Sequence, residues 1–247
     1  MPLDEYRRKR SADRTPEPFG DVRRVGSPMG GLFVVQKHAA TRMHYDFRLE
    51  MEGVLRSWAI PRGPSLNPAD KRLAAMVEDH PIEYADFEGI IPEGNYGAGE
   101  VIVWDRGVYR VTDPSRDAAA AVREGKINIE LFGFKLGGGY ALVRTGALRA
   151  RARQSAGREQ WLLIKREDGF ASVESDLEES RPRSVLSGLT VQELGDTPHL
   201  GAAIVAELEK LSAPSLKMPP TPGSFPFALA RLAEKPVEGA GWLYEIK

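Results

Sequence analysis

The stretch HYDFRLEMEGVLRSWAI (residues 44–60) decides the fold, because it encodes two strands and the turn that joins them. Residues 44–50 and 54–60 are both β-prone segments. The pair Glu52-Gly53 lies between them, and a glycine-containing pair at this position is typical of a tight hairpin turn. An antiparallel hairpin is therefore expected at the centre of the protein.

Polar and hydrophobic side chains alternate along the first of these strands. The polar ones are His44, Asp46 and Arg48. Because successive side chains of a strand point to opposite faces, these three share one face and lie about 7 Å apart from one to the next. The intervening residues Tyr45, Phe47 and Leu49 are hydrophobic and are expected to face a hydrophobic layer.

Further short β-prone segments flank the hairpin and are separated by Gly, Pro and Asp. They are residues 32–37, 73–78, 99–105, 108–112, 126–132, 139–145 and 160–166. The pattern is typical of a mainly β protein, here a small closed antiparallel β-barrel or a sandwich. Residues 117–124 (DAAAAVRE) predict a short flanking helix, and Trp104 and Trp161 are expected in the core.

Four segments are predicted along the 247 residues. Residues 1–30 form a basic, extended N-terminal arm with seven Lys and Arg residues in its first 24 positions, and residues 31–168 form the barrel domain. Residues 169–226 are expected to be a linker with one helix at 201–211 and a proline-rich end. Residues 227–247 are again rich in apolar residues and form the fourth segment. The whole chain beyond residue 168 is expected to be partly helical or disordered.

Composition restricts the class of protein. The chain is 42% hydrophobic and 28% charged, which is ordinary for a globular protein, and it has no apolar run long enough to span a membrane. It has no cysteine, which excludes disulfides and thiolate zinc sites, and its N-terminus is no secretory signal, so a cytoplasmic location is the default expectation. The net charge of −1 does not indicate a nucleic-acid partner, but the basic arm suits a phosphate backbone.

The stretch KHAATRMHYDFRLE contains two of the four histidines in the chain. A turn after His38 brings this side chain beside His44 and Asp46, and two imidazoles with a carboxylate suit manganese, iron or zinc. Arg48 at the rim suits bidentate binding of a phosphate. The alternative is a purely structural His–Asp–Arg network in the barrel interior, but four such residues within eleven positions favour a functional site.

Three other features are less specific. His80 and Tyr84, in EDHPIEYADF, form a pair able to bind or protonate phosphoryl oxygens. The segment GNYGAG (residues 94–99) is expected to be a glycine-rich hairpin without a ligand, and His199 is expected to be inert.

Three long motifs add a resemblance to a known family. FVVQKHAATRMHYDFRLEMEGVLRSWAIPRGPS, EDHPIEYADFEGIIPEGNYGAGEVIVWDRG and WLLIKRED resemble the 3′-phosphoesterase domain of bacterial DNA ligase D, over residues 6–168. The resemblance implies a small β-barrel with a crescent-shaped groove. It implies removal of a 3′-terminal ribonucleotide and then of the remaining 3′-phosphate, which leaves a 3′-hydroxyl for ligation in non-homologous end joining.

The same resemblance implies roles for individual residues. His38, His44 and Asp46 would ligate Mn²⁺, and the catalytic contacts to the scissile phosphate would come from Arg48, His80 and Tyr84. Further substrate-binding roles fall to Arg10, Glu17, Arg62 and Arg72. The implied substrates are DNA or DNA–RNA primer-template 3′ ends, and the implied partners are the Ku protein and the ligase and polymerase components of end joining.

The last seven residues, GWLYEIK, resemble the start of a ligase adenylation domain, with Lys247 at the position of the nucleotidyl-accepting lysine. No ligase activity is expected from this chain, which we expect to be a fragment or the product of a truncated gene. Two other functions remain open. One is a non-catalytic DNA-end binding appendage, and the other is a non-haem iron oxygenase with His44, Asp46 and His80 as its metal ligands.

Overall fold

The computed structural model of the 247-residue chain describes residues 3–20, 27, 29–113, 116–145, 159–173 and 177–197. Several expectations lie outside these residues. They concern His199, the helix at 201–211, the proline-rich segment, and the ligase-like end with Lys247. Among the described helices, none is long and apolar enough to cross a membrane.

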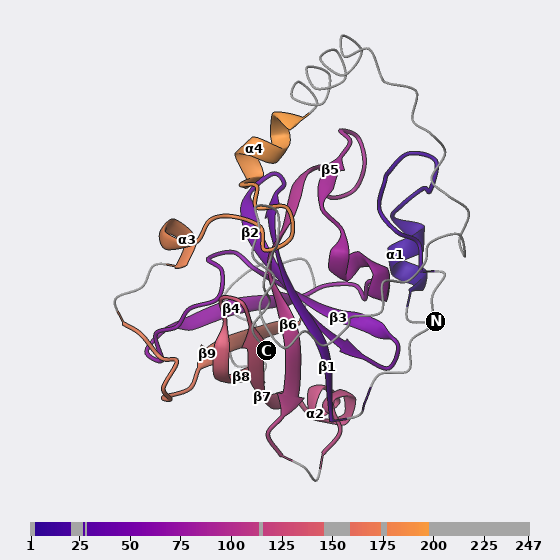
Figure 1. The fold of residues 1–247 in the computed structure, drawn as a ribbon. Helices are drawn as coiled ribbons and strands as arrows, with labels where there is room; N and C mark the ends of the chain where they lie inside the picture. The colour runs from indigo at the N-terminus through magenta and orange to yellow at the C-terminus, as the bar shows by residue number, and fades with distance from the viewer. Residues whose placement is uncertain are drawn as a thin grey trace, which may run out of the picture. The chain divides into compact units, whose positions relative to one another are not determined.

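The predicted closed antiparallel barrel is confirmed (Figure 1). Neighbouring strands pair in the order β1-β2-β3-β4-β9-β8-β7-β6, and a further pairing of β1 with β6 closes the ring. The first four strands are β1 (Gly30–Ala39), β2 (Met43–Met51), β3 (Val54–Ile60) and β4 (Lys71–Met76). The others are β6 (Gly99–Val111), β7 (Lys126–Gly133), β8 (Gly137–Arg144) and β9 (Gln160–Lys165), while the short β5 (Gly89–Ile91) adds to β6 outside the ring.

The expected hairpin joins β2 to β3. Met51 pairs with Val54, so the loop is the two residues Glu52 and Gly53. Their φ angles are +51° and +77°, and two successive positive values are those of the primed turns that match the twist of antiparallel strands. This loop sets the register that places Arg48 opposite Ser57.

Where two strands were expected at 99–105 and 108–112, the structure has the single strand β6. Gly107 does not end the strand, because it pairs with Phe33 on one side and with Gly133 on the other. A side chain there would meet the backbone, since an added Cβ would lie 2.1 Å from the Phe132 carbonyl oxygen. The glycine is therefore needed because the neighbouring strand lies close to it, and it does not form a turn.

The barrel interior holds the main hydrophobic core. Tyr45, Phe47 and Leu49 of β2 point into it as predicted, as do Trp104 and Trp161, which are 1% and 0% exposed. The polar side chains of β2 therefore lie on the outer face of the barrel wall, and not in its interior as the structural alternative supposed.

A second core covers this outer face of β1, β2 and β3. It contains Val34 and Leu55 from the strands and Tyr6, Ile82 and Tyr84 from the segments that pack on them. These segments are the helix α1 (Asp4–Arg8) and the 3-10 helix η1 (Ile82–Asp86). The arm thus begins with a helix, with Asp4 and Glu5 in its first turn and Arg7 and Arg8 in its last, as the helix dipole favours.

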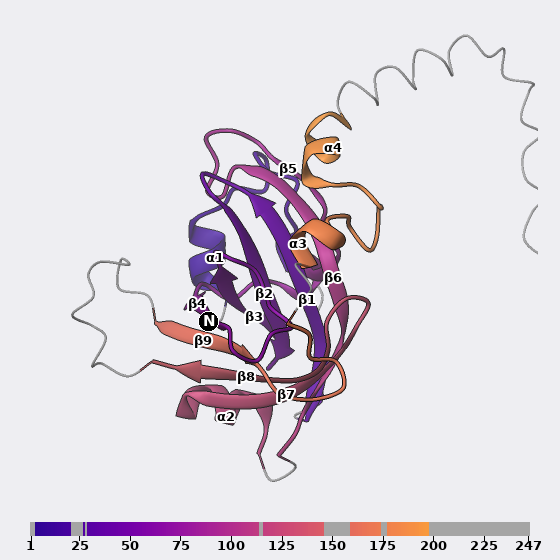
Figure 2. The ribbon, with the colours of Figure 1, turned by 90° about the vertical axis from the view of Figure 1, so that its left-hand side faces the viewer.

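The described part of the expected linker packs on the barrel. It carries the helices α3 (Leu177–Ser180) and α4 (Val191–Gly195), which lie on the opposite side of β1 and β6 from α1 (Figure 2). Leu177 belongs to the main core. Val191 and Leu194 form a separate hydrophobic cluster with Ile102 of β6. The short helix expected at 117–124 is also present, as α2 (Ala118–Glu124).

Candidate metal and phosphate site

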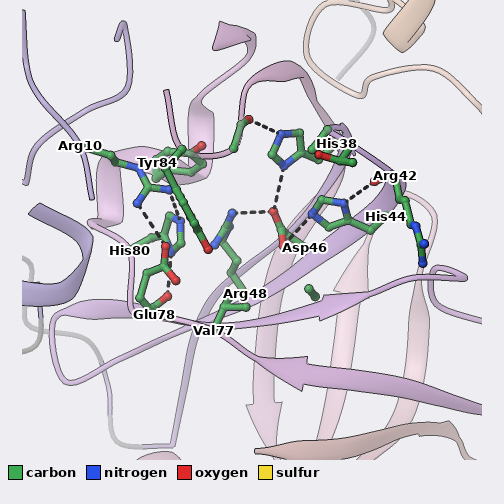
Figure 3. A pocket seen from close by; sticks show the side chains of 15 residues that line it. Arg10, His38, Arg42, His44, Asp46, Arg48, Val77, Glu78, His80 and Tyr84 are labelled. Atoms are coloured by element: carbon green, nitrogen blue, oxygen red, sulfur yellow. Dashed lines mark hydrogen bonds and ion pairs between the residues drawn. The ribbon is translucent and has the colours of Figure 1, made fainter. Parts of the chain in front are cut away.

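A cavity of about 400 Å³ opens over the outer faces of β1, β2 and β3 (Figure 3). Strand pairing brings its residues together, because His38 lies opposite His44 and Arg48 lies opposite Ser57. The predicted residues that line it are Arg10, His38, His44, Asp46, Arg48, His80 and Tyr84. Glu17 does not line the cavity, but it accepts hydrogen bonds from Arg10 and Tyr84, which do.

Asp46 lies between the two imidazoles and Arg48 (Figure 3). Its carboxylate oxygens are 3.6 Å from His38 Nδ1 and 3.7 Å from His44 Nε2, which is longer than a hydrogen bond in both cases. Burial opposes ionisation of this carboxyl, but the positive Arg48 and the neighbouring imidazoles hold its pKa well below the ordinary value. Asp46 is therefore a carboxylate at neutral pH.

Backbone carbonyls orient both imidazoles. His38 donates from Nε2 to the Gly97 oxygen at 2.8 Å, and His44 donates from Nδ1 to the Arg42 oxygen at 2.9 Å. Each ring therefore turns its other nitrogen toward the Asp46 carboxylate. Histidines that bind metals are usually held in this way, by a hydrogen bond from the nitrogen that does not bind.

The three side chains fit a divalent cation. Their ligand atoms all lie within 4.8 Å of one another, and among the described residues they are the only such group of His, Asp or Glu. Two imidazole nitrogens and a carboxylate oxygen form a donor set that Mn²⁺, Fe²⁺ and Zn²⁺ accept.

Arg48 is 2% exposed and is fixed by three acceptors. Its Nε donates to Gln36 Oε1 at 2.8 Å, Nη1 to Ser57 Oγ at 2.9 Å and Nη2 to Asp46 Oδ2 at 2.9 Å. Because a guanidinium has five N–H groups, one remains on each terminal nitrogen beyond these three bonds. Arginine N–H groups on two terminal nitrogens are able to donate to oxygens of a phosphate.

His80 lies beside Arg48, since Ser57 Oγ is near both. Its Nδ1 donates to the Glu78 carbonyl at 2.9 Å, and its Nε2 is 3.5 Å from Arg10 Nη2. Burial, and then the positive charges of Arg48 and Arg10, lower the pKa of His80 well below its ordinary value. This imidazole is neutral at pH 7 and presents a lone pair toward the arginine.

The N-terminal arm closes one side of the cavity through paired charges. Arg10 binds Glu17 at 2.8 Å and Glu78 at 3.2 Å, and Tyr84 donates to the same Glu17 carboxylate at 3.0 Å. Burial, followed by the charge of Glu17, raises the pKa of Tyr84 well above its ordinary value, so its hydroxyl keeps its proton. The structure therefore brings Arg10 and Glu17 to the site.

Arg62 and Arg72 do not line this cavity. They line a separate depression of about 310 Å³ with Pro61, Lys71 and Leu73, near the end of β3. The two depressions are lined by residues that are close in sequence, because Ala59 lines the first and Pro61 lines the second. Arg72 is paired with Asp70 at 2.9 Å.

Sequence reasoning missed the contributions of the loop at residues 94–99 and of three polar partners. The loop was expected to be a hairpin without a ligand, which stays a prediction, and its Gly97 carbonyl orients His38. Gly97 has a φ of +77°, which turns the loop at this point, and no spacing in the sequence points to that contact. Gln36, Ser57 and Glu78 were also missed, although Gln36 precedes His38 by two residues on the same strand face and could have been found by alternation.

The oxygenase ligand set is not assembled in the described part of the chain. His80 lies among Arg10, Ser57 and Glu78, whereas His38 is the imidazole that accompanies His44 and Asp46.

The hydrogen bonds predict the tautomer of each imidazole in the metal-free protein. Long-range ¹H–¹⁵N spectra of histidine-labelled protein at pH 8 should show the Nε2–H form for His38 and the Nδ1–H form for His44 and His80. On lowering the pH to 6, His80 should stay neutral because its pKa is depressed. Single His→Gln variants assign the signals, and a proton on His38 Nδ1 would contradict the proposed ligand orientation.

Comparison with known proteins identifies the domain. The sequence profile of the family described as "DNA Ligase D 3'-phosphoesterase domain" matches residues 36–144. The chain is 46% identical over 248 residues to the "Multifunctional non-homologous end joining protein LigD" of Pseudomonas aeruginosa, an alignment that covers 100% of this chain and 28% of that protein.

Two mycobacterial relatives match a shorter part. The "Multifunctional non-homologous end joining DNA repair protein LigD" of Mycobacterium tuberculosis H37Rv is 48% identical over 147 residues, which cover 60% of this chain and 19% of that protein. The "Multifunctional non-homologous end joining protein LigD" of Mycolicibacterium smegmatis is 43% identical over 147 residues, covering 58% and 19%. The chain thus spans less than a third of the length of these relatives. Residues 36–144, which form most of the barrel, belong to the family of DNA ligase D 3′-phosphoesterase domains.

Proposed function

We propose that the protein is a metal-dependent phosphoesterase that processes the 3′ ends of DNA strands in non-homologous end joining. It removes a 3′-terminal ribonucleotide and a 3′-phosphate and leaves a 3′-hydroxyl for ligation. The domain family supports a role in DNA end processing, and the relatives are named as end-joining proteins.

One observation carries the proposal: a donor set for a cation and a set of phosphate-binding side chains share one cavity. Asp46 links them, since it lies beside His38 and His44 on one side and binds Arg48 on the other. A phosphate bound by Arg48 would therefore lie next to the cation.

His38, His44 and Asp46 would hold the ion, which we propose to be Mn²⁺. When bound, it would polarise a phosphoryl oxygen and favour ionisation of a water molecule. The charges around the donor set are largely paired. Arg48 is paired with Asp46, and Arg10 with Glu17 and Glu78, while Arg42 also lines the cavity.

Arg48 would hold the substrate phosphate by its two remaining terminal N–H groups. Its three existing bonds fix the guanidinium before substrate arrives, so little rotamer entropy is lost on binding. The positive charge then faces the negative charge that grows on the phosphoryl oxygens in the transition state.

His80 and Tyr84 would complete the phosphate contacts. Entry of a phosphate dianion brings negative charge next to His80 and raises its affinity for a proton. The protonated Nε2 would then donate to a phosphoryl oxygen. Tyr84 keeps its proton, and its ring lies 4.9 Å from the Arg48 guanidinium, which restricts where the phosphate can lie.

Arg10 and Glu17 would serve the removal of the ribonucleotide, and Arg62 and Arg72 would bind the strand further from its end. The depression that contains Arg62 and Arg72 lies near the end of β3, and its Pro61 is two residues from Ala59, which lines the cavity. In a longer end-joining protein, the ligase and polymerase components and the Ku protein would be the partners.

A primer-extension gel tests the activity directly. Purified protein is incubated with primer-templates that end in a 3′-phosphate or in one 3′-ribonucleotide, with and without manganese. We expect conversion of both ends to a 3′-hydroxyl only with the metal. Metal-independent binding without any 3′ trimming would overturn the proposal and support the non-catalytic end-binding alternative.

A further inference from the structure

Tyr96 is an exposed aromatic residue on the wall of the catalytic cavity. It lies on the loop between β5 and β6, and it lines the cavity together with Gly97 and His38. Its side chain is 40% exposed, whereas Tyr84, the other tyrosine in the wall, is 2% exposed. The mechanism proposed above gives Tyr96 no role.

Two cations of the arm lie against the Tyr96 ring. Lys9 Nζ is 4.6 Å from the ring centroid and the Arg10 guanidinium is 5.4 Å from it. Both cations form ion pairs with Glu78, at 3.1 and 3.2 Å, which restrict their movement. Their contacts with the ring in turn restrict the position of Tyr96.

The loop that carries Tyr96 is anchored on both sides of the cavity. Asn95 donates to the Arg14 carbonyl at 3.1 Å, and the Gly97 carbonyl accepts from His38 at 2.8 Å. One three-residue segment therefore joins the arm, the exposed ring and a proposed metal ligand. The position of the ring relative to the metal donors is fixed by this connection.

The cavity has room for more than a phosphate. Its volume of about 400 Å³ falls within the range of pockets that enclose a whole small molecule. The proposed phosphate-binding groups are Arg48 of β2, Tyr84 of η1 and His80, and the ring of Tyr96 also lines the cavity. Aromatic side chains beside such a path commonly stack on bases of single-stranded nucleic acids.

We propose that Tyr96 stacks on the base of the 3′-terminal nucleotide and so positions the terminal phosphate at Arg48 and the metal donors. This inference rests on the proposed 3′-end activity. Stacking is tolerant of sequence, because every base has a π-face, and the enzyme would accept any terminal base in this way. Tyr96 is thus a positioning residue for the substrate.

The test compares Tyr96→Ala and Tyr96→Phe with wild type on two primer-templates with a 3′-phosphate. One ends in a normal nucleotide and the other in a tetrahydrofuran abasic residue. On the normal end, Tyr96→Ala should raise KM roughly 5- to 150-fold with little change in kcat, and Tyr96→Phe should keep most of the affinity. On the abasic end, wild type and Tyr96→Ala should have the same KM, since there is no base to stack.

Phe134→Ala is the matched control, because Phe134 is 73% exposed and does not line the cavity. An equal loss for Tyr96→Ala on the two ends would mean that the ring only supports Lys9 and Arg10, and this result would overturn the inference. An unchanged KM on the normal end would also overturn it.

A binding measurement separates this inference from the proposed activity. A primer with 2-aminopurine as its 3′-terminal base is titrated with the full chain in EDTA. Quenching by wild type and Tyr96→Phe, but not by Tyr96→Ala, supports stacking even if no phosphate is ever released. Quenching by wild type, Tyr96→Ala and Tyr96→Phe alike, or by none of the three proteins, contradicts stacking even if the phosphoesterase activity is confirmed.

Discussion

Replacement of His44 by alanine should lower the manganese-dependent release of phosphate from a 3′-phosphate primer end by at least about 100-fold. The change removes one of three donor atoms that lie within 4.8 Å of one another. The His44 side chain is 22% exposed and makes no core contact, so its loss should leave the barrel intact. Phosphate release is measured as a rate over a range of manganese concentrations, and the affinity for manganese is measured by calorimetry.

Two controls make this result specific. His199→Ala changes a histidine that we expect to be inert, and it should retain full activity. Thermal unfolding should show that His44→Ala is as stable as the wild type. A His44→Ala protein that keeps its rate at every manganese concentration would show that the His–His–Asp group does not bind the catalytic ion.

Ending the chain after residue 172 should destabilise the barrel by several kcal/mol relative to a chain that ends after residue 197. The shorter chain loses Leu177 from the main core and Val191 and Leu194 from the cluster around Ile102. Burial of each such side chain contributes about 1.5–3 kcal/mol, and a whole domain is stable by only about 5–15 kcal/mol.

Polar contacts are lost as well in the shorter chain. Trp104 Nε1 and Lys135 Nζ both donate to the Arg181 carbonyl at 2.8 Å, and the Val185 amide donates to the Val103 carbonyl at 2.9 Å. The indole N–H of Trp104 would lose its partner. Urea unfolding curves of the two chains give the difference, and equal midpoints would show that residues 177–197 do not belong to the folded domain.

The local pattern of the sequence was sufficient for the central hairpin and for half of the site. Alternation along residues 44–50 predicted which side chains share a face, and Glu52-Gly53 predicted the turn. His38 is only six residues from His44, so a short turn was enough to bring them together. All these inferences depend on residues that are close in sequence.

The rest of the site depends on contacts between distant residues. His80 reaches the cavity because its backbone pairs with Leu55, 25 residues earlier. The Gly97 carbonyl meets His38 across 59 residues. The resemblance to a family supplied His80 and Tyr84, but alternation alone could not tell whether the polar face of β2 pointed into the barrel or out of it.

The N-terminal arm shows the limit of charge as a predictor. Its basic residues suit a phosphate backbone, and the structure pairs two of them, Lys9 with Glu78, and Arg10 with Glu17 and Glu78. The composition of the arm does not reveal these pairs, because Glu78 lies almost 70 residues away. Tyr6, which is fully buried, is the residue that holds the arm to the barrel.

The β2 strand supplies the barrel core with one set of side chains and the His–Asp–Arg cavity with the other. It is held on both sides, by β1 and by β3, so it has no free edge along which to slide. An insertion or deletion of a single residue in this strand would exchange the two sets. It would carry Asp46 and Arg48 into the hydrophobic interior and turn Tyr45 and Phe47 outward. Any change of length within this strand would therefore disturb the core and the cavity together.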